Sequence, residues 1–235
     1  MKLALFGSGA MGQLVSSLAA EDGHEVVAAF SSSDASRSVE ELAERLSGAD
    51  AAIDFSVASA VLKNIEACAL AGVPVVEGTT GWNAHEEEAR RLVTERDGAL
   101  IYGANFSVGV NLFYRIAAHA ADLFHNFDDY APFIEEAHHA RKRDAPSGTA
   151  LRLRDLLNQK YESVIPVAST RAGYIPGTHH VGFDSAADQI MLTHTARSRV
   201  GFARGALTAA RWIVGRKGVY EFSEVIDEIL VNCKS

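Results

Sequence analysis

The sequence has few cysteines, few prolines and no long apolar run. Its 235 residues include 2 cysteines and 5 prolines. The cysteines, Cys68 and Cys233, are too few for a disulfide framework and suit a reducing compartment. No segment reaches the roughly 18 consecutive apolar residues that a membrane span needs, and the apolar run at the N-terminus stops at Gly7, too early for a signal peptide. We therefore expect a cytoplasmic protein with no membrane partner.

An excess of positive charge is also missing. The chain has 22 Lys and Arg against 30 Asp and Glu, which leaves a formal net charge of −8. Because phosphate binding draws on a basic surface, we expect no nucleic-acid partner. The length allows one large domain or two small ones. With 48% hydrophobic residues, such a chain can bury its core without a disulfide or a structural metal.

The first hundred residues alternate short apolar runs with helical stretches. The clearest helix is expected over Ala84–Arg96, with Asn83 as its N-cap and Glu86 at the capping-box position. The apolar runs, each bounded by Gly, Asp or Ser, are Lys2–Phe6, His24–Phe30, Ala51–Ser56, Val73–Thr79 and Ala99–Phe106. Strands that alternate with helices predict an α/β fold, a Rossmann-type doubly wound parallel sheet.

The pattern changes after about residue 107. Helices are expected over Val108–Phe124 and Ala150–Lys160, separated by an apolar run and a polar cluster. Residues 167–196 then alternate as strands do, and helices over Gly201–Gly215 and from Ser223 close the chain. Strands without intervening helices predict a second, α+β domain built on a mixed sheet.

Two glycine-rich turns indicate a dinucleotide site. The segment Gly7-Ser8-Gly9-Ala10-Met11-Gly12 directly follows the first strand and opens a helix. Its glycines permit a tight turn and close backbone approach, while the helix N-terminus offers free N–H groups to a pyrophosphate. Gly78-Thr79-Thr80-Gly81 follows the fourth strand, so both turns would lie at the carboxyl ends of strands, where ligands bind. The alternative is a glycine-rich turn that binds nothing.

The second strand lacks the acidic residue that usually bonds the adenosine ribose. Its end holds Phe30-Ser31-Ser32-Ser33, with no acid until Asp34 and a basic residue at Arg37. Hydroxyl groups with a nearby arginine can bind a 2′-phosphate. The segment therefore favours NADPH, or the use of NADH as well, with Ser31 as a contact. Serine-rich loops also occur at strand ends for turn chemistry alone.

The polar cluster at residues 136–150, E-A-H-H-A-R-K-R-D-A-P-S-G-T-A, holds two histidines and three cationic side chains before a helix. The backbone N–H groups of Gly148 and Thr149, with the Lys142 ammonium, would form an anion site that suits a carboxylate. His138 and His139 can exchange protons near neutral pH. A solvated basic loop, the plainer interpretation, would hardly need the Ser-Gly-Thr turn.

This cluster resembles the signature of the bacterial dihydrodipicolinate reductases (4-hydroxy-tetrahydrodipicolinate reductases), E-x-H-H-x-x-K-x-D-A-P-S-G-T-A. Residues 136–150 match every fixed position. The resemblance covers nearly the whole chain, through the glycine loop and the segments 54–56, 78–81, 104–111, 175–179 and 194–199. The chain departs from the family in its glycine loop, which lacks the arginine that many members carry before Met11.

The resemblance implies an enzyme of lysine and diaminopimelate biosynthesis. Family members are homotetramers that reduce a cyclic unsaturated dicarboxylate, derived from 4-hydroxy-tetrahydrodipicolinate, to tetrahydrodipicolinate with NADH or NADPH. By position, His138 looks like the catalytic acid/base and Lys142 like the proton donor, whereas His139, Gly148 and Thr149 look like substrate contacts. The implied cofactor contacts are Gly7, Ser8, Gly9, Ala10, Met11 and Gly12, then Gly78, Thr79 and Thr80, and finally Gly103, Ala104, Asn105 and Phe106.

The resemblance also implies a domain arrangement. In this family the C-terminal end of the chain returns to the nucleotide domain. We therefore expect a dinucleotide-binding domain of residues 1–106 plus 211–235 and a substrate-binding and oligomerisation domain of residues 107–210. The tail helix is expected to pack beside the first strand.

Three other interpretations stay open. The histidine pairs at 138/139 and 179/180, with His194, suggest a metal site. Adjacent histidines point in different directions, however, and no Cys or Glu has zinc spacing, so we expect no metal. An enzyme similar to aspartate or homoserine dehydrogenase could use Lys142 electrostatically, but the histidine pair argues against it. A nucleotide-sensing regulator would have no reason to keep both His138 and Lys142.

Overall fold

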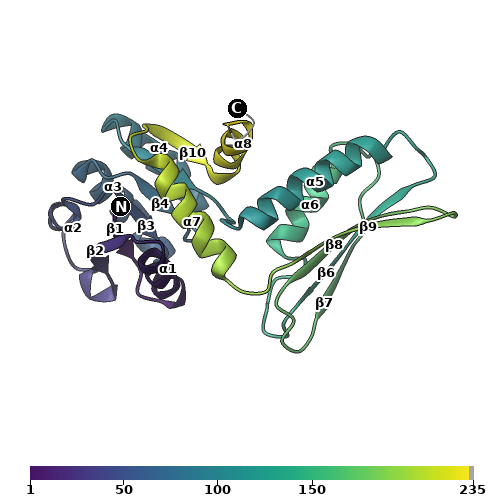
Figure 1. The fold of residues 1–235 in the computed structure, drawn as a ribbon, viewed down its shortest axis with the longest axis horizontal. Coiled ribbons are helices and arrows are strands. Elements are labelled where there is room, and N and C mark those ends of the chain that lie inside the picture. Colours follow the sequence, from purple (N-terminus) through teal and green to yellow (C-terminus); the bar gives the residue numbers. More distant parts are fainter. Residues whose placement is uncertain (233–235) are drawn as a thin grey trace. The chain divides into compact units, whose positions relative to one another are not determined.

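The computed structural model describes residues 1–232 and divides the chain into two compact units (Figure 1). The first unit consists of Met1–Ser107 and the segment that begins at Val200; the second is Val108–Arg199. The sequence-based boundaries differ at two points, because they assign Ser107 and residues 200–210 to the second domain. Residues 200–210 form most of a helix, α7 (Val200–Ile213), that packs on strands of the first unit.

The first unit is a six-stranded parallel sheet with helices on both faces, which confirms the Rossmann-type fold. The strand order is β10-β5-β4-β3-β1-β2. Every residue of β3 and β4 is buried, since both faces are covered, whereas exposed residues alternate along the edge strand β2. The strands are β1 (Lys2–Phe6), β2 (Glu25–Phe30), β3 (Ala51–Asp54), β4 (Val75–Glu77), β5 (Ala99–Tyr102) and β10 (Gly218–Glu221).

The helices of this unit form two layers. Helices α1 and α7 pack together on one face, and α2, α3 and α4 pack side by side on the other (Figure 1). Gly205 lets α7 approach closely, because a Cβ there would lie 1.7 Å from the backbone oxygen of Phe106. The remaining helices are α1 (Ala10–Glu21), α2 (Val39–Leu46), α3 (Val61–Ala71), α4 (Glu86–Glu95) and α8 (Phe222–Asn232), with short 3₁₀ turns η1 (Ser32–Asp34), η2 (Ala58–Ala60) and η3 (Asn83–His85).

Two local expectations are wrong. Asn83 does not cap α4; it begins the 3₁₀ turn η3, and Glu86 is the first residue of the helix. The tail helix α8 does not lie beside the first strand either. It packs on α7 and on β10, a short strand that the sequence analysis did not predict. Strand β1 is already flanked by β2 and β3, so β10 adds to the sheet at β5 instead.

The second unit is a mixed four-stranded sheet with two helices, as the sequence predicts. The strand order is β7-β6-β8-β9; β6 runs parallel to β7, and β8 runs antiparallel to β6 and β9. Its core includes Phe113, Ile134, Leu153 and Phe183. The elements are α5 (Val108–Phe124), β6 (Ala131–His138), α6 (Gly148–Asn158), β7 (Val167–Arg171), β8 (Thr178–Asp184) and β9 (Gln189–Thr195).

The structure also bears on the expectations about membrane spans and about one of the two cysteines. Within residues 1–232, no helix combines the length and the apolar character that crossing a bilayer requires. Cys68 is completely buried on α3, and burial raises the pKa of its thiol well above the usual range. Cys233 lies outside the described residues.

Candidate active site

Four polar side chains gather on one face of the sheet of the second unit. Glu136 and His138 are two residues apart on β6, so their side chains point to the same face. The strand register places Arg171 of β7 beside His138, and His179 of β8 opposite Glu136. Helix α6 begins over this face, with Ser147 as its N-cap.

The buried carboxylate of Glu136 is the centre of this group. Its side chain has no exposed surface. Oε1 accepts hydrogen bonds from Arg171 Nη2 at 2.6 Å and from the Ser147 backbone N–H at 3.3 Å, while Oε2 lies 2.9 Å from His138 Nε2. Burial raises the pKa of Glu136, but the hydrogen bond and the charge of Arg171 outweigh it, so the pKa is lowered overall. Glu136 is therefore a charged acceptor at neutral pH.

His138 has one ring edge facing protein groups and one edge that a glycine leaves uncovered. Its Nε2 faces Glu136 and also lies 3.4 Å from His179 Nε2. At Gly177, whose φ is +129°, a Cβ would lie 3.1 Å from Cε1 and 3.2 Å from Nδ1 of His138, so a side chain there would cover that edge. Burial lowers the pKa of His138, and the nearby negative charge of Glu136 partly opposes this shift.

His179 is a neutral imidazole whose ring packs edge-on against that of His138. It is 4% exposed, and burial followed by the charge of His138 lowers its pKa to about 4. Its Nε2 lies 3.1 Å from Ser147 Oγ, the hydroxyl that also caps α6 by accepting from the Ala150 N–H. His179 thus ties His138 to the start of α6.

Lys142 lies in the loop between β6 and α6, where its Nζ is 2.8 Å from Asp144 Oδ1. Hydrogen bonding to Lys142 lowers the pKa of Asp144. The backbone of this loop is held by Arg171, whose Nη2 donates to the Asp144 carbonyl at 2.6 Å. The ammonium is close enough to His138 to help lower the pKa of that imidazole. Lys142 is about one quarter exposed, so it can leave Asp144 for a bound anion.

The start of α6 has the features of an anion site. No acidic residue lies in its first turn, and a Cβ at Gly148 would meet nothing within 4 Å. Burial raises the pKa of Tyr114 on α5, and the neighbouring Thr149 side chain partly opposes this shift. The backbone N–H groups at the helix start are the part available to an anion. His139 has a buried Nδ1 with no hydrogen-bond partner among the described residues.

The structure adds residues that the sequence analysis missed. Glu136, Arg171 and His179 had no role assigned, although residues 136 and 179 lie in segments that carry the family resemblance. The sequence argument that no Cys or Glu has zinc spacing does not account for Glu136, because the ligand atoms of Glu136, His138 and His179 all lie within 4.8 Å of one another. Since Glu136 and His138 already lie at hydrogen-bonding distance, we interpret the group as a proton-transfer network.

In the first unit, the expected cofactor loops meet at one edge of the sheet. Strands β1, β4 and β5 run parallel, and Gly7, Gly78 and Gly103 each directly follow the last residue of one of them. The carboxyl ends of parallel strands share an edge, so the three loops lie along it. This arrangement is the one that the sequence predicts for a dinucleotide site.

The glycines of the first loop are present for different structural reasons. Gly7 has φ +97° and a Cβ there would lie 2.3 Å from the Phe55 oxygen; a Cβ at Gly12 would lie 1.9 Å from the Gly7 oxygen. These two positions therefore demand glycine for the turn and for close packing. A Cβ at Gly9, the residue before α1, would meet nothing within 4 Å, and the first turn of α1 has no acidic residue. The space above α1 therefore fits a pyrophosphate.

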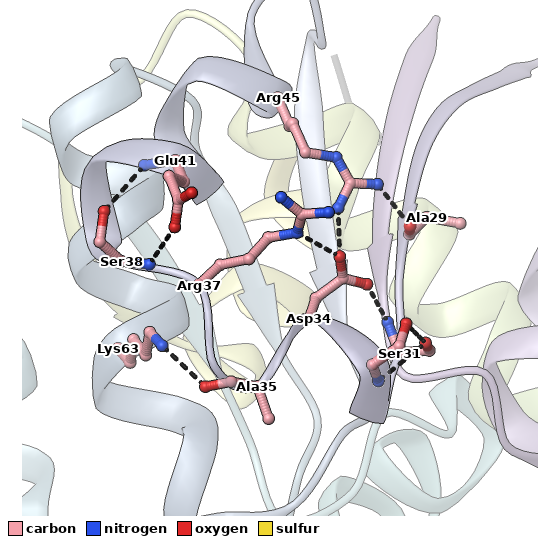
Figure 2. Close-up of polar contacts among 10 residues, drawn as sticks. Ala29, Ser31, Asp34, Ala35, Arg37, Ser38, Glu41, Arg45 and Lys63 are labelled. Carbon is pink, nitrogen blue, oxygen red and sulfur yellow. Dashed lines mark hydrogen bonds and ion pairs between the residues drawn. The ribbon is translucent and has the colours of Figure 1, made fainter.

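At the end of β2, the carboxylate of Asp34 points toward the Ser31 backbone and two arginines (Figure 2). Asp34 Oδ2 accepts from the Ser31 N–H at 3.0 Å, and Oδ1 accepts from Arg37 Nε at 2.7 Å and from Arg45. These bonds, of which the one from Ser31 is the largest cause, lower the pKa of Asp34 to about 2. Arg45 also stacks over the Phe30 ring at 4.5 Å. Two guanidinium groups thus border the Ser31 turn.

Sequence comparison matches nearly the whole chain to one enzyme family. The profile described as dihydrodipicolinate reductase, N-terminus, matches residues 1–106, and the profile of the C-terminus matches residues 109–226. The 4-hydroxy-tetrahydrodipicolinate reductase of Christiangramia forsetii is 36% identical over 99% of this chain and 100% of the relative. The enzyme of that name from Archaeoglobus fulgidus is also 36% identical, over 97% of this chain and 100% of the relative.

Solved structures show the same fold. The dipicolinate-bound dihydrodipicolinate reductase from Paenisporosarcina sp. TG-14 aligns with a TM-score of 0.79 and 20% identity, over 96% of this chain and 99% of that one. A scyllo-inositol dehydrogenase from Lactobacillus casei, with bound NAD(H) and scyllo-inositol, aligns with a TM-score of 0.55 and 11% identity, over 99% of this chain and 89% of that one.

Proposed function

The chain belongs to the dihydrodipicolinate reductase family of oxidoreductases, and from this premise we propose the reaction, the cofactor and the residues that act. The protein reduces the dihydrodipicolinate-type cyclic dicarboxylate derived from 4-hydroxy-tetrahydrodipicolinate to tetrahydrodipicolinate, in lysine and diaminopimelate biosynthesis. The observation that carries this proposal is the buried Glu136–His138 contact of 2.9 Å beside a cationic loop and an open helix start.

His138 is the acid/base in this proposal. Hydride addition to a conjugated imine leaves negative charge on the ring, and this charge must be met by a proton. Because Nε2 faces Glu136 and His179, Nδ1 is the ring atom available for proton exchange, at the edge that Gly177 leaves uncovered. A positioned acid of this kind contributes about 10²–10⁴-fold to the rate.

Lys142 is the proton donor. In the absence of substrate its ammonium is held by Asp144. A dicarboxylate that binds at the start of α6 offers a second anionic partner, so the ammonium can turn toward the ring where charge develops. Arg171 stabilises the loop during this exchange, because it holds the Asp144 backbone and Glu136 at the same time.

The substrate carboxylates bind at the backbone of Gly148 and Thr149 and at His139. The N-terminus of α6 attracts an anion because its first N–H groups have no partner within the helix. The buried, unpartnered Nδ1 of His139 gains a hydrogen bond in such a complex. The solved relative of the same fold is described as dipicolinate-bound, which supports a cyclic dicarboxylate as the ligand class.

A nicotinamide cofactor supplies the hydride when it is bound. The glycine loop, Gly78–Thr80 and Gly103–Phe106 would hold it, and the open positions at Gly9 and at the first turn of α1 fit its pyrophosphate. We infer a preference for NADPH, with use of NADH as well. Arg37 and Arg45 border Ser31 with two cations, while the one carboxylate there, Asp34, already accepts bonds from both.

The homotetramer and the cytoplasmic location implied by the family resemblance belong to the same proposal. Sedimentation equilibrium of the purified protein tests the assembly, since a tetramer has four times the 25.2 kDa mass of the chain.

The proposal is tested by following oxidation of NADPH and of NADH, with the substrate generated in situ from pyruvate and aspartate semialdehyde by a synthase. Wild type is expected to turn over, and His138→Gln to lose nearly all turnover. His125→Gln is the matched control, because His125 lies just beyond α5 in the same unit and bonds to the Ala121 carbonyl instead of the network. A folded, cofactor-binding protein with no turnover would overturn the reductase proposal in favour of another NAD(P) enzyme or a nucleotide sensor.

A further inference from the structure

Two buried carboxyl groups lie side by side at the ligand-binding edge of the sheet in the first unit. Asp54 is the last residue of β3 and Glu77 the last residue of β4, and the register of these parallel strands pairs them. Both residues have no exposed surface. Two buried acids in contact are costly unless they share a proton or find cations. The proposed reaction uses neither of them.

Both carboxyl groups bond to the turn that follows β4. Asp54 Oδ1 accepts from the Ser56 N–H at 2.7 Å and from Thr79 Oγ1 at 3.4 Å, and Oδ2 accepts from Asn64 Nδ2 at 2.7 Å. Glu77 Oε1 accepts from the Thr79 N–H at 2.6 Å. Thr79 is therefore held from two sides, by its hydroxyl and by its backbone.

The pair carries one proton. Both carboxyl groups bond to Thr79, and Glu77 Oε2 is a buried oxygen with no hydrogen-bond partner among the described residues. Two adjacent buried carboxyl groups without a cation cannot both be charged except at a high cost, so we infer that one of them is protonated. Burial, followed by the charge of Asp54, raises the pKa of Glu77 well above its usual range. Burial also raises the pKa of Asp54, but the bonds from Ser56 and Asn64 lower it again in part. Glu77, whose Oε2 has no donor to bond, is thus the neutral acid, and Asp54, which accepts from Ser56, Asn64 and Thr79, is the carboxylate.

The groups that bond to the pair or interact with it carry no positive charge, so a proton is what offsets the cost of burying the two carboxyl groups. Ser56, Asn64 and Thr79 donate hydrogen bonds, and the thiol of Cys68 on α3 is the further titratable group that interacts with both acids. None of these four groups is a cation. The pKa of Cys68 is itself raised, by burial and then by the two acids, so the thiol is neutral as well.

We propose that Asp54 and Glu77 are positioning residues for the cofactor: a carboxyl–carboxylate pair that shares one proton and holds Thr79, and with it the Gly78–Gly81 turn, in the geometry that receives the nicotinamide cofactor. The pair also joins this turn to the one after β3, because Thr79 Oγ1 accepts from the Ser56 N–H at 3.1 Å. The positioning part rests on the proposed function, while the shared proton does not.

The shared proton is tested by the pH dependence of stability in Glu77→Gln. In wild type, the folded state keeps a proton on Glu77 that the unfolded state has already lost above about pH 4.5, so burial of this acid costs progressively more stability as the pH rises. Glutamine keeps both the donor and the acceptor but has no proton to lose. We expect the Tm of Glu77→Gln minus that of wild type to increase as the pH rises above about 4.5.

Glu66→Gln is the matched control, because Glu66 lies on the same helix as Asn64 but is partly exposed and pairs with Arg96. Its Tm difference from wild type is expected to stay constant with pH. A Tm difference for Glu77→Gln that is equally independent of pH would overturn the shared proton, whatever the reaction of the protein.

The positioning role is tested by the affinity for NADPH, measured from the fluorescence of the bound cofactor. Glu77→Gln keeps the oxygen that accepts from the Thr79 N–H and is expected to bind within about twofold of wild type, whereas Glu77→Leu frees the Thr79 N–H and is expected to bind about tenfold more weakly. Equal affinities of the two variants would overturn the positioning role. Failure of wild type to bind NADPH would overturn the proposed function and this role together, while the Tm series would still report on the proton.

Discussion

Arg171 donates to the buried carboxylate of Glu136 at 2.6 Å and with the same Nη2 to the Asp144 carbonyl at 2.6 Å. One guanidinium group therefore joins the end of β6 to the loop that presents Lys142. The contact explains how a glutamate with no exposed surface remains charged beside His138. It also means that the position of the loop depends on a charge inside the sheet.

Glu136→Gln is expected to destabilise the protein, because the change leaves Arg171 without its anionic partner. The loss of one member of a buried ion pair costs about 3 kcal/mol. Urea denaturation of the wild type and the variant measures the difference. Glu135→Gln is the control, since Glu135 is the adjacent, exposed residue of β6. Equal midpoints for Glu136→Gln and Glu135→Gln would contradict this account of the pair.

Lys142→Ala is expected to lower kcat by about 10²-fold or more and to leave the affinity for NADPH within about twofold of wild type. The reason is that Lys142 acts on the substrate ring and not on the cofactor. Steady-state kinetics and cofactor titration separate the two effects. Lys160→Ala, which removes an exposed lysine paired with Asp122, is expected to change neither quantity. A large loss of NADPH affinity in Lys142→Ala would count against its assigned role.

His179 is expected to make stability depend on pH between its ordinary pKa of 6.5 and its folded-state pKa of about 4. In this window the unfolded state binds a proton that the folded state rejects, so the stability is full above the window and is lost as the pH falls through it. The slope is about 1.4 kcal/mol per pH unit. The difference in the free energy of unfolding between wild type and His179→Gln, measured at several pH values, isolates this contribution. If the difference does not change with pH, His179 is not a buried neutral imidazole.

Arg45→Ala is expected to raise KM for NADPH about tenfold and to leave KM for NADH unchanged, because the guanidinium group would bond the 2′-phosphate that only NADPH carries. Arg37→Ala is expected to act in the same direction. The ratio of kcat/KM for the two cofactors is the measurement. Arg154→Ala, on the exposed side of α6, serves as the control. An equal loss with both cofactors would show that Arg45 acts through the stability of the Ser31 turn.

The sequence was sufficient for the fold class and for much of the candidate site. Buried parallel strands leave continuous apolar runs, and a strand–turn–helix with glycines leaves a recognisable spacing, so the Rossmann-type unit could be predicted locally. The same holds for α5, which the structure bounds at Val108–Phe124 as expected. Local signals failed at Asn83 and at β10, where a short turn and a four-residue edge strand depend on contacts made elsewhere in the chain.

By itself, the sequence determined the two kinds of sheet, the glycine loops and the signature that contains His138, Lys142 and Gly148. These features follow from neighbours along the chain, whose propensities and spacings act over a few residues. Tertiary structure alone decided that Arg171 and His179 lie beside Glu136 and His138, because register between strands far apart in sequence brings them to one face. It alone also brought Arg45 to Asp34 and placed Asp54 beside Glu77. In each case the protonation and the bonding of a side chain depend on burial and on partners that include residues outside its own segment.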